Sequence, residues 1–253
     1  MEQTIHSIAD HGLDLRCVQY AKEAYLAAPD ITGLRNTAAI VRDCGTHIMV
    51  AFRGTQSIQE WLTDAEFVPM EIYGCKIHRG FGTAYFDLAS RLQAKLEALD
   101  WSDKKPLVLT GHSLGGALAL LAAFVLAKQY PLGYIAAVTT FGQPRVGNRA
   151  FVDAYDSEPS AFQQVLGEIT QRYVNSVDVV PHLPLRGFLL GYRHTQAETW
   201  FNALGMRFNN PGFWMQLSDA AFACWRFYTS RQEQLLADHH IDRYVNLVTK
   251  EAP

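Results

Sequence analysis

The sequence predicts an α/β fold in which a mainly parallel central sheet is flanked by helices on both faces. Two short apolar runs, 106–110 and 134–141, have the length and composition of buried strands, and a continuous apolar helix is predicted between them at 116–129. Buried strands that alternate with helices are typical of parallel sheets, because the crossover helices cover both faces. At 253 residues, 49% of them hydrophobic, the chain can bury one sizeable core.

The other elements follow in chain order. Apolar, β-branched runs on either side of Gly45 predict a hairpin of two strands at 38–41 and 47–52. Leucines that recur at helical spacing predict a helix over 86–99. Further strands are expected at about 171–175 and within the alternating stretch 192–200.

Composition and charge exclude several classes of protein. The chain shows no linker or repeat, so we expect one domain over residues 1–253. A net charge of -3 without any basic run gives no means of binding nucleic acid. The longest apolar run, 116–127, is shorter than the ~20 residues that cross a bilayer, so no stable membrane span is expected. Residues 1–16 lack the apolar stretch of a secretory signal, which indicates a cytoplasmic protein, although leaderless export leaves no such mark.

The cysteines and histidines do not form a metal-binding pattern. Cys17, Cys44, Cys75 and Cys224 lie far apart without a C-x-x-C pair, and we interpret them as small buried residues. No pair of histidines combines zinc-site spacing with carboxylate or thiolate neighbours, so we expect no metal and no cofactor. Nothing in the sequence indicates the oligomeric state.

A G-x-S-x-G motif, 111–115, lies between a predicted strand and a predicted helix. This setting predicts a sharp turn that holds Oγ of Ser113, the candidate nucleophile, out above the sheet, because Gly111 and Gly115 lack the Cβ atoms that would collide around it. The backbone N–H of Leu114, at the positive end of the helix dipole, can stabilise an oxyanion formed on attack by the serine. The alternative is an ordinary serine in a glycine-rich helix cap.

A serine nucleophile needs a base and a group that orients the base. In folds with this strand–turn–helix motif, the acid and then the histidine follow the serine along the chain. Asp178 follows the strand predicted at 171–175, and Pro181 prevents any continuation. His239 and His240 come after the last predicted strand, and both remain candidates for the base.

Six blocks of the sequence together resemble the class 3 lipase family. They are 52–55, 77–81, 111–116, 141–148, 177–181 and 238–244, and the resemblance spans about residues 35 to 248. It implies an α/β-hydrolase fold and a triacylglycerol lipase-like serine hydrolase that acts on lipid esters. In the last block of the family, four residues separate the histidine from the tyrosine, and this spacing to Tyr244 implies His239 as the base. The backbone N–H of Thr55 would complete the oxyanion hole with Leu114.

The resemblance also implies a lid over residues 56–67, with Ile58, Trp61 and Leu62 as its apolar side. Such a lid would cover the site in water and open at an oil–water interface. The alternative is a fixed helix packed on the core. A second apolar stretch, 208–228, is interpreted as core, with a wall of the acyl pocket or a second lipid-contacting surface as alternatives.

The predicted function is therefore hydrolysis of carboxylic esters of lipids through an acyl-enzyme. Phospholipase A1, monoacylglycerol lipase or feruloyl esterase activity on the same residues is the main alternative. A non-enzymatic binding module is disfavoured, because Ser113, Asp178, His239 and Thr55 are all present.

Overall fold

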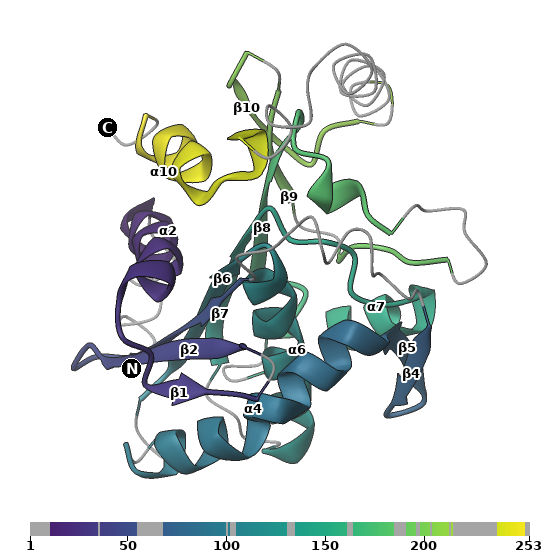
Figure 1. The fold of residues 1–253 in the computed structure, drawn as a ribbon. Coiled ribbons are helices and arrows are strands. Elements are labelled where there is room, and N and C mark those ends of the chain that lie inside the picture. Colours follow the sequence, from purple (N-terminus) through teal and green to yellow (C-terminus); the bar gives the residue numbers. More distant parts are fainter. Residues whose placement is uncertain are drawn as a thin grey trace.

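A computed structural model describes residues 11–34, 36–54, 68–99, 101, 105–130, 135–160, 164–184, 191–195, 198–202, 204–212, 214 and 237–250. Within these ranges eight strands form one sheet, in the order β1-β2-β3-β6-β7-β8-β9-β10 (Figure 1). The strands are β1 (Ile31–Thr32), β2 (Ala38–Asp43), β3 (Ile48–Arg53), β6 (Leu107–His112), β7 (Ile135–Phe141), β8 (Thr170–Asn175), β9 (Glu198–Phe201) and β10 (Arg207–Asn209). Neighbours from β3 to β9 are parallel, whereas β1, β2 and β10 pair antiparallel at the edges. The predicted fold class is confirmed.

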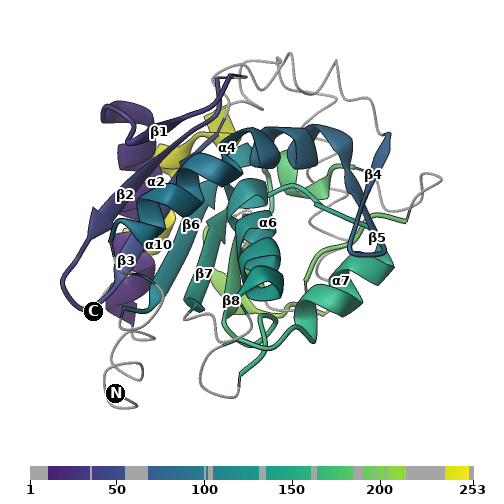
Figure 2. The ribbon, with the colours of Figure 1, turned by 90° about the horizontal axis from the view of Figure 1, so that it is seen from below.

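Helices cover both faces of the sheet. Helices α2 (His11–Leu26) and α10 (Ile241–Thr249) lie on one face, and α4 (Arg79–Glu97) and α6 (Leu114–Gln129) lie on the other (Figures 1 and 2). A short helix, α7 (Arg149–Asp156), lies beside an antiparallel pair of strands, β4 (Pro69–Ile72) and β5 (Cys75–His78). This arrangement leaves the carboxyl ends of the parallel strands on one common edge.

Successive side chains of the central strands pack in two separate cores, one on each face of the sheet. In β3, Ile48, Val50 and Phe52 pack in the core formed with α4 and α6, whereas Met49 packs in the core formed with α2 and α10. Strand side chains alternate between faces, and here both faces are buried, so residues 48–52 of β3 and 107–109 of β6 are all apolar. Helix α6 is apolar all round, since every residue from 115 to 127 is buried. No helix in the described ranges is both long and apolar enough to cross a bilayer.

Some elements differ from the sequence-based prediction. Helix α4 begins at Arg79 rather than at residue 86, because Phe81 and Tyr85 extend its buried face toward the N-terminus while Gly80 and Gly82 obscure the helical pattern. Of the stretch 192–200, in which a strand was predicted, the part from Glu198 onward belongs to strand β9. Helices α2 and α10, strand β10 and the β4–β5 pair were not predicted.

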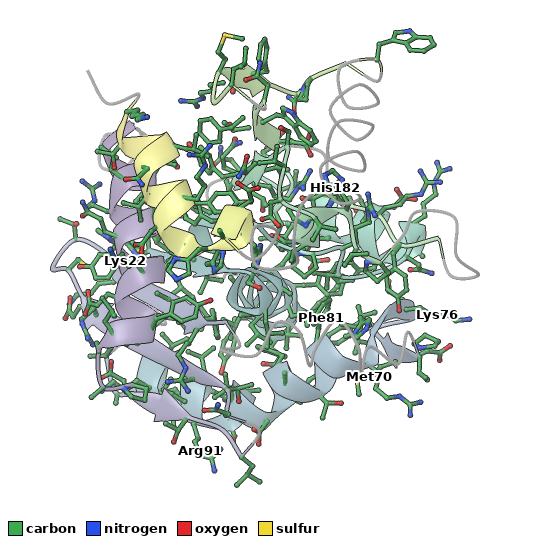
Figure 3. The ribbon with its side chains drawn as sticks, turned by 45° about the horizontal axis from the view of Figure 1, so that its top comes forward. Lys22, Met70, Lys76, Phe81, Arg91 and His182 are labelled. Carbon is green, nitrogen blue, oxygen red and sulfur yellow. The ribbon has the colours of Figure 1, made fainter. Side chains whose placement is uncertain are left out.

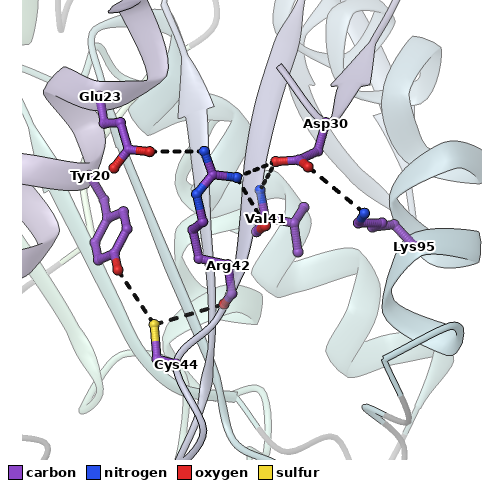
Figure 4. Close-up of polar contacts among 7 residues, drawn as sticks. All are labelled: Tyr20, Glu23, Asp30, Val41, Arg42, Cys44 and Lys95. Atoms are coloured by element: carbon purple, nitrogen blue, oxygen red, sulfur yellow. Dashed lines mark hydrogen bonds and ion pairs between the residues drawn. The ribbon is translucent and has the colours of Figure 1, made fainter. Parts of the chain in front are cut away.

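Ion pairs join α2 to its surroundings. Arg42 of β2 contacts Glu23 of α2 at 2.8 Å and Asp30 at 2.6 Å, and Lys95 of α4 lies 3.8 Å from Asp30 (Figure 4). Lys22 of α2, labelled in Figure 3, contacts Asp242 at the start of α10 at 2.7 Å. Such partly exposed pairs each contribute about 0–1 kcal/mol, so their effect is mainly to orient α2.

The cysteines lie in different environments. Cys17 and Cys75 are buried free thiols, as predicted. Cys44 is only partly buried and lies 3.5 Å from the Tyr20 hydroxyl, so its environment differs from the prediction (Figure 4). Cys224 lies outside the described residues.

Candidate functional site

The turn between β6 and α6 holds Ser113 in a strained conformation. Its φ is 58° and its ψ is -128°, and the residue is 3% exposed. A positive φ in a residue with a Cβ costs about 1–2 kcal/mol, so the surroundings must impose it. The Ser113 N–H donates to the carbonyl of Phe141 in β7 at 3.0 Å, which ties the turn to the neighbouring strand.

Glycines on both sides of the serine permit this turn. A Cβ at Gly111 would lie 2.3 Å from the carbonyl carbon of Gly115, and a Cβ at Gly115 would lie 2.1 Å from the carbonyl oxygen of Phe52. Both distances are far below contact, so larger residues would force the helix away from β3 and β6. Close approach of the helix start to the strands therefore requires both glycines.

Leu114 is the first residue of α6. N–H groups in the first turn of a helix have no partner within the helix and lie at the positive end of its dipole. The start of α6 can therefore supply a hydrogen-bond donor beside Ser113. The second predicted donor, Thr55, lies outside the described residues, as do the lid candidate 56–67 with Ile58, Trp61 and Leu62 and most of the stretch 208–228.

Asp178, which follows β8, and His239, which precedes α10, are brought together. His239 Nδ1 lies 2.6 Å from Asp178 Oδ2, and both residues are 0% exposed. A carboxylate only accepts, so Nδ1 donates and Nε2 is the unprotonated nitrogen of the neutral ring. Nε2 is buried without a hydrogen-bond partner among the described residues. The ring therefore has one oriented nitrogen and one nitrogen that is ready to accept a proton.

The loop that carries the carboxylate is held by several groups. The Val180 N–H, at the start of a 3-10 turn over Val180–His182, donates to Asp178 Oδ1 at 2.9 Å. Arg145 donates from Nη1 to the carbonyls of His182 and Pro184. His182 is labelled in Figure 3. Both carboxylate oxygens of Asp178 thus have donors, which fixes its orientation.

Tyr244 of α10 is a further partner of the carboxylate. Its hydroxyl donates to Asp178 Oδ2 at 2.6 Å and accepts from the Asn175 N–H at 3.2 Å. Burial, reinforced by the charge of Asp178, raises the pKa of Tyr244 well above its ordinary value, so the hydroxyl keeps its proton. Although the sequence shows this tyrosine within a resemblance block, its contact with Asp178 was not predicted.

Gly142 lies against the Asp178–His239 pair. Its φ is +58°, and a Cβ there would lie 3.0 Å from Asp178 Oδ2, 3.1 Å from His239 Cε1 and 3.1 Å from Tyr244 Cε2. The sequence analysis gave this glycine no role beyond its place in the block 141–148. A glycine directly after a buried strand, at the edge where the site is expected, was the signal that could have found it.

His112 directly precedes Ser113 in sequence, and its side chain contacts His239 and Tyr25. Its ring lies 4.6 Å from the His239 ring between centroids, and its Nε2 lies 2.7 Å from the His239 carbonyl. Its Nδ1 lies 2.9 Å from the hydroxyl of Tyr25 in α2. The role of Tyr25 was missed because no motif of the sequence includes it.

His240 is separated from the site. Its side chain is exposed and accepts from the Asp242 N–H at 3.3 Å, which caps α10. Of the two histidines that sequence reasoning left open, the structure brings His239 to Asp178. Within the described ranges, no group of three or more His, Cys, Asp or Glu side chains could hold a metal ion. That no metal or cofactor is needed stays a prediction.

The sequence model described as Lipase (class 3) matches residues 49–188, more than half of the chain. This chain belongs to the class 3 lipase family. The match includes the turn at Ser113 and the loop at Asp178.

Curated lipases are similar to this chain over part of its length. A lipase of Rhizomucor miehei is 38% identical over 162 residues, which are 60% of this chain and 41% of that protein. A secreted mono- and diacylglycerol lipase of Fusarium solani is 30% identical over 193 residues, which are 74% of this chain and 54% of that protein. This class 3 lipase chain thus spans about half the length of these relatives.

Solved structures show the same fold. The native propeptide complex of Rhizomucor miehei lipase matches with a TM-score of 0.63 and 27% identity, over 83% of this chain and 72% of that chain. A triacylglycerol lipase whose catalytic centre is described as a serine protease triad matches with a TM-score of 0.57 and 32% identity, over 72% and 68% of the two chains. The fold of this chain is therefore the α/β-hydrolase fold.

The comparisons correct one prediction. The cytoplasmic location is contradicted by relatives named as secreted mono- and diacylglycerol lipases, including those of Fusarium solani and Penicillium cyclopium. The prediction was wrong because it relied on a missing apolar segment, and such an absence does not assign a compartment.

Proposed function

We propose that this protein is a serine hydrolase that cleaves carboxylic esters of lipids, with Ser113 as nucleophile, His239 as base and Asp178 as the group that orients the base. The observation that carries the proposal is the buried pair in which Asp178 fixes one nitrogen of His239 and leaves Nε2 open. Family membership and the triad described for a related triacylglycerol lipase support it.

The proposed reaction is acyl transfer in two steps. In the first, His239 Nε2 takes the Ser113 Oγ proton while Oγ bonds to the ester carbonyl carbon, and the protonated ring then gives that proton to the departing alcohol. In the second, water attacks the acyl-enzyme, with His239 again taking the proton. Asp178 stabilises the imidazolium in both steps because its carboxylate lies 2.6 Å from Nδ1.

Backbone N–H groups would stabilise the oxyanion of each step. Leu114 supplies one donor from the start of α6, and we propose Thr55 as the second. Each donor of this kind is worth roughly 10²–10³ in rate, so two of them could supply most of the transition-state stabilisation. The proposal requires no metal or cofactor.

We propose acylglycerols as the substrate class. The relatives are named as lipases, a triacylglycerol lipase, and mono- and diacylglycerol lipases, which supports esters of glycerol over those of other alcohols. We further propose that residues 56–67 form a lid that opens at an oil–water interface, with Ile58, Trp61 and Leu62 toward the lipid.

The test is hydrolysis of p-nitrophenyl esters with acyl chains of two to sixteen carbons, with a tributyrin emulsion alongside. Wild type should cleave, and Ser113→Ala should lose ~10⁴-fold or more in kcat. Ser157→Ala, at the exposed end of α7, is the matched control and should retain wild-type activity. Cleavage by Ser113→Ala at the wild-type rate would overturn the mechanism. A jump in rate above the solubility limit of tributyrin would support the lid.

A further inference from the structure

Four groups from separate parts of the chain form a continuous series of hydrogen bonds beside the site. The Gly54 N–H hydrogen-bonds to the Tyr25 hydroxyl, which lies 2.9 Å from His112 Nδ1. His112 Nε2 lies 2.7 Å from the carbonyl of His239. The series starts next to Thr55, the proposed oxyanion donor, and ends on the backbone of the proposed base.

The direction of every bond in this series is determined. The His239 carbonyl can only accept, so His112 Nε2 carries a proton. Burial lowers the pKa of His112 well below 6.5, so the ring is neutral and Nδ1 is an acceptor. The Tyr25 hydroxyl therefore donates to Nδ1, and its oxygen accepts from the Gly54 N–H. Tyr25 and His112 each bond to a neighbour on either side, so neither side chain can be removed without leaving another group of the series without its partner.

The packing around the series is tight. A Cβ at Gly54 would lie 2.2 Å from the Tyr25 hydroxyl oxygen and 2.8 Å from the His112 carbonyl oxygen. The backbone of Gly54 is thus pressed between α2 and the end of β6. The ring of His112 also lies 4.6 Å from that of His239, so it supports the base from the side as well as through the carbonyl.

We propose that Tyr25 and His112 are positioning residues that hold two parts of the site, the backbone at Gly54 and the backbone at His239, in one hydrogen-bonded unit. This inference rests on the proposed function. Neither side chain needs to touch the substrate. Their effect is to keep the backbone at Gly54 and the backbone of the proposed base at a fixed separation through both steps of the reaction.

The expected effect of breaking the unit is on turnover rather than on substrate binding. A misplacement of about 1 Å in a catalytic group costs on the order of 10²-fold in rate. Tyr25→Phe keeps the ring and removes only the hydroxyl, so the Gly54 N–H and His112 Nδ1 both lose their partner. We expect kcat per titrated active site to fall about tenfold, with KM changed less than twofold.

The experiment compares variants normalised by active-site titration with a phosphonate, on p-nitrophenyl butyrate. Tyr20→Phe is the matched control, because Tyr20 lies on the same helix but contacts Cys44, and its kcat should equal that of wild type. His112→Leu should lose as much as Tyr25→Phe or more. His112→Gln keeps an N–H donor for the His239 carbonyl and should recover most of that loss.

A double variant distinguishes one unit from two separate packing effects. Residues that act together show non-additive losses, so Tyr25→Phe combined with His112→Leu should be no slower than His112→Leu alone. Additive losses, a wild-type kcat for Tyr25→Phe, or no recovery with His112→Gln would overturn the inference. If wild type hydrolyses no ester, the proposed function fails and the inference fails with it. If Ser113 is essential but Tyr25→Phe is unimpaired, only the inference fails.

Discussion

Substitution of Gly142 by alanine should damage the site with little change to the rest of the protein. Gly142 has a φ of +58°, and an added Cβ would lie 3.0 Å from Asp178 Oδ2 and 3.1 Å from His239 Cε1. Both partners are buried and joined at 2.6 Å, so neither can move without disturbing the other.

Gly142→Ala should lower both the stability of the protein and its kcat. The left-handed backbone costs an alanine about 1 kcal/mol of stability relative to glycine. The contacts require the carboxylate or the imidazole to shift by a few tenths of an ångström. Since a shift of about 1 Å costs on the order of 10²-fold in rate, we expect kcat to fall about tenfold.

The assay is kcat on p-nitrophenyl butyrate per titrated active site, together with urea unfolding. Gly74→Ala is the matched control, because Gly74 has a φ of +77° and a Cβ there would have nothing within 4 Å. It should lose the same stability and no activity. If Gly142→Ala retains the wild-type kcat, or if Gly74→Ala loses as much activity, the steric argument is wrong.

Two further predictions concern histidines. In the same ester assay, His239→Ala should lose ~10⁴-fold or more in kcat, whereas His240→Ala should stay within a few-fold of wild type. The opposite order would identify His240 as the base. Burial lowers the pKa of His78 from 6.5 to about 4, so the unfolded chain takes up a proton as pH falls below 6.5 while the folded chain does not until about pH 4. Stability from this group is therefore complete above pH 6.5 and lost as pH falls, by about 2 kcal/mol between pH 7 and pH 5. Urea unfolding of His78→Phe should show a correspondingly smaller difference between these two pH values than wild type, and an unchanged difference would contradict the assignment.

The parts of the fold that the sequence predicted were those with strong local patterns. Strand β6 is buried throughout, and strands β3 and β7 and helix α6 are mostly buried, so composition and length alone identify them. Helix α2 was missed because the residues that it buries, including Cys17, Val18 and Ala21, are small and lie among charged residues. Such a helix forms because the sheet face needs covering, which a local pattern does not show.

The site residues likewise divide into those that a local motif predicts and those that only contacts distant in sequence reveal. Ser113 was predicted from a local motif, because the strand, the turn and the helix are contiguous in sequence. The choice between His239 and His240 depended on the family register, since the contact with Asp178 joins residues 61 positions apart. The contact between Tyr25 and His112 joins residues 87 positions apart without any motif, so only the three-dimensional structure reveals it.

The division of helices between the two faces of the sheet has a consequence for engineering. Ser113, the proposed nucleophile, leads into α6 on one face, whereas His239, the proposed base, leads into α10 and Tyr25 lies on α2, both on the other face (Figure 2). The two cores that these helices form are separated by the strands. A library that repacks the α4–α6 core therefore samples the surroundings of the proposed nucleophile while leaving the support of the proposed base intact, and a library on the α2–α10 core does the reverse. Under the proposed mechanism, the sheet allows a designer to vary the surroundings of these two groups separately.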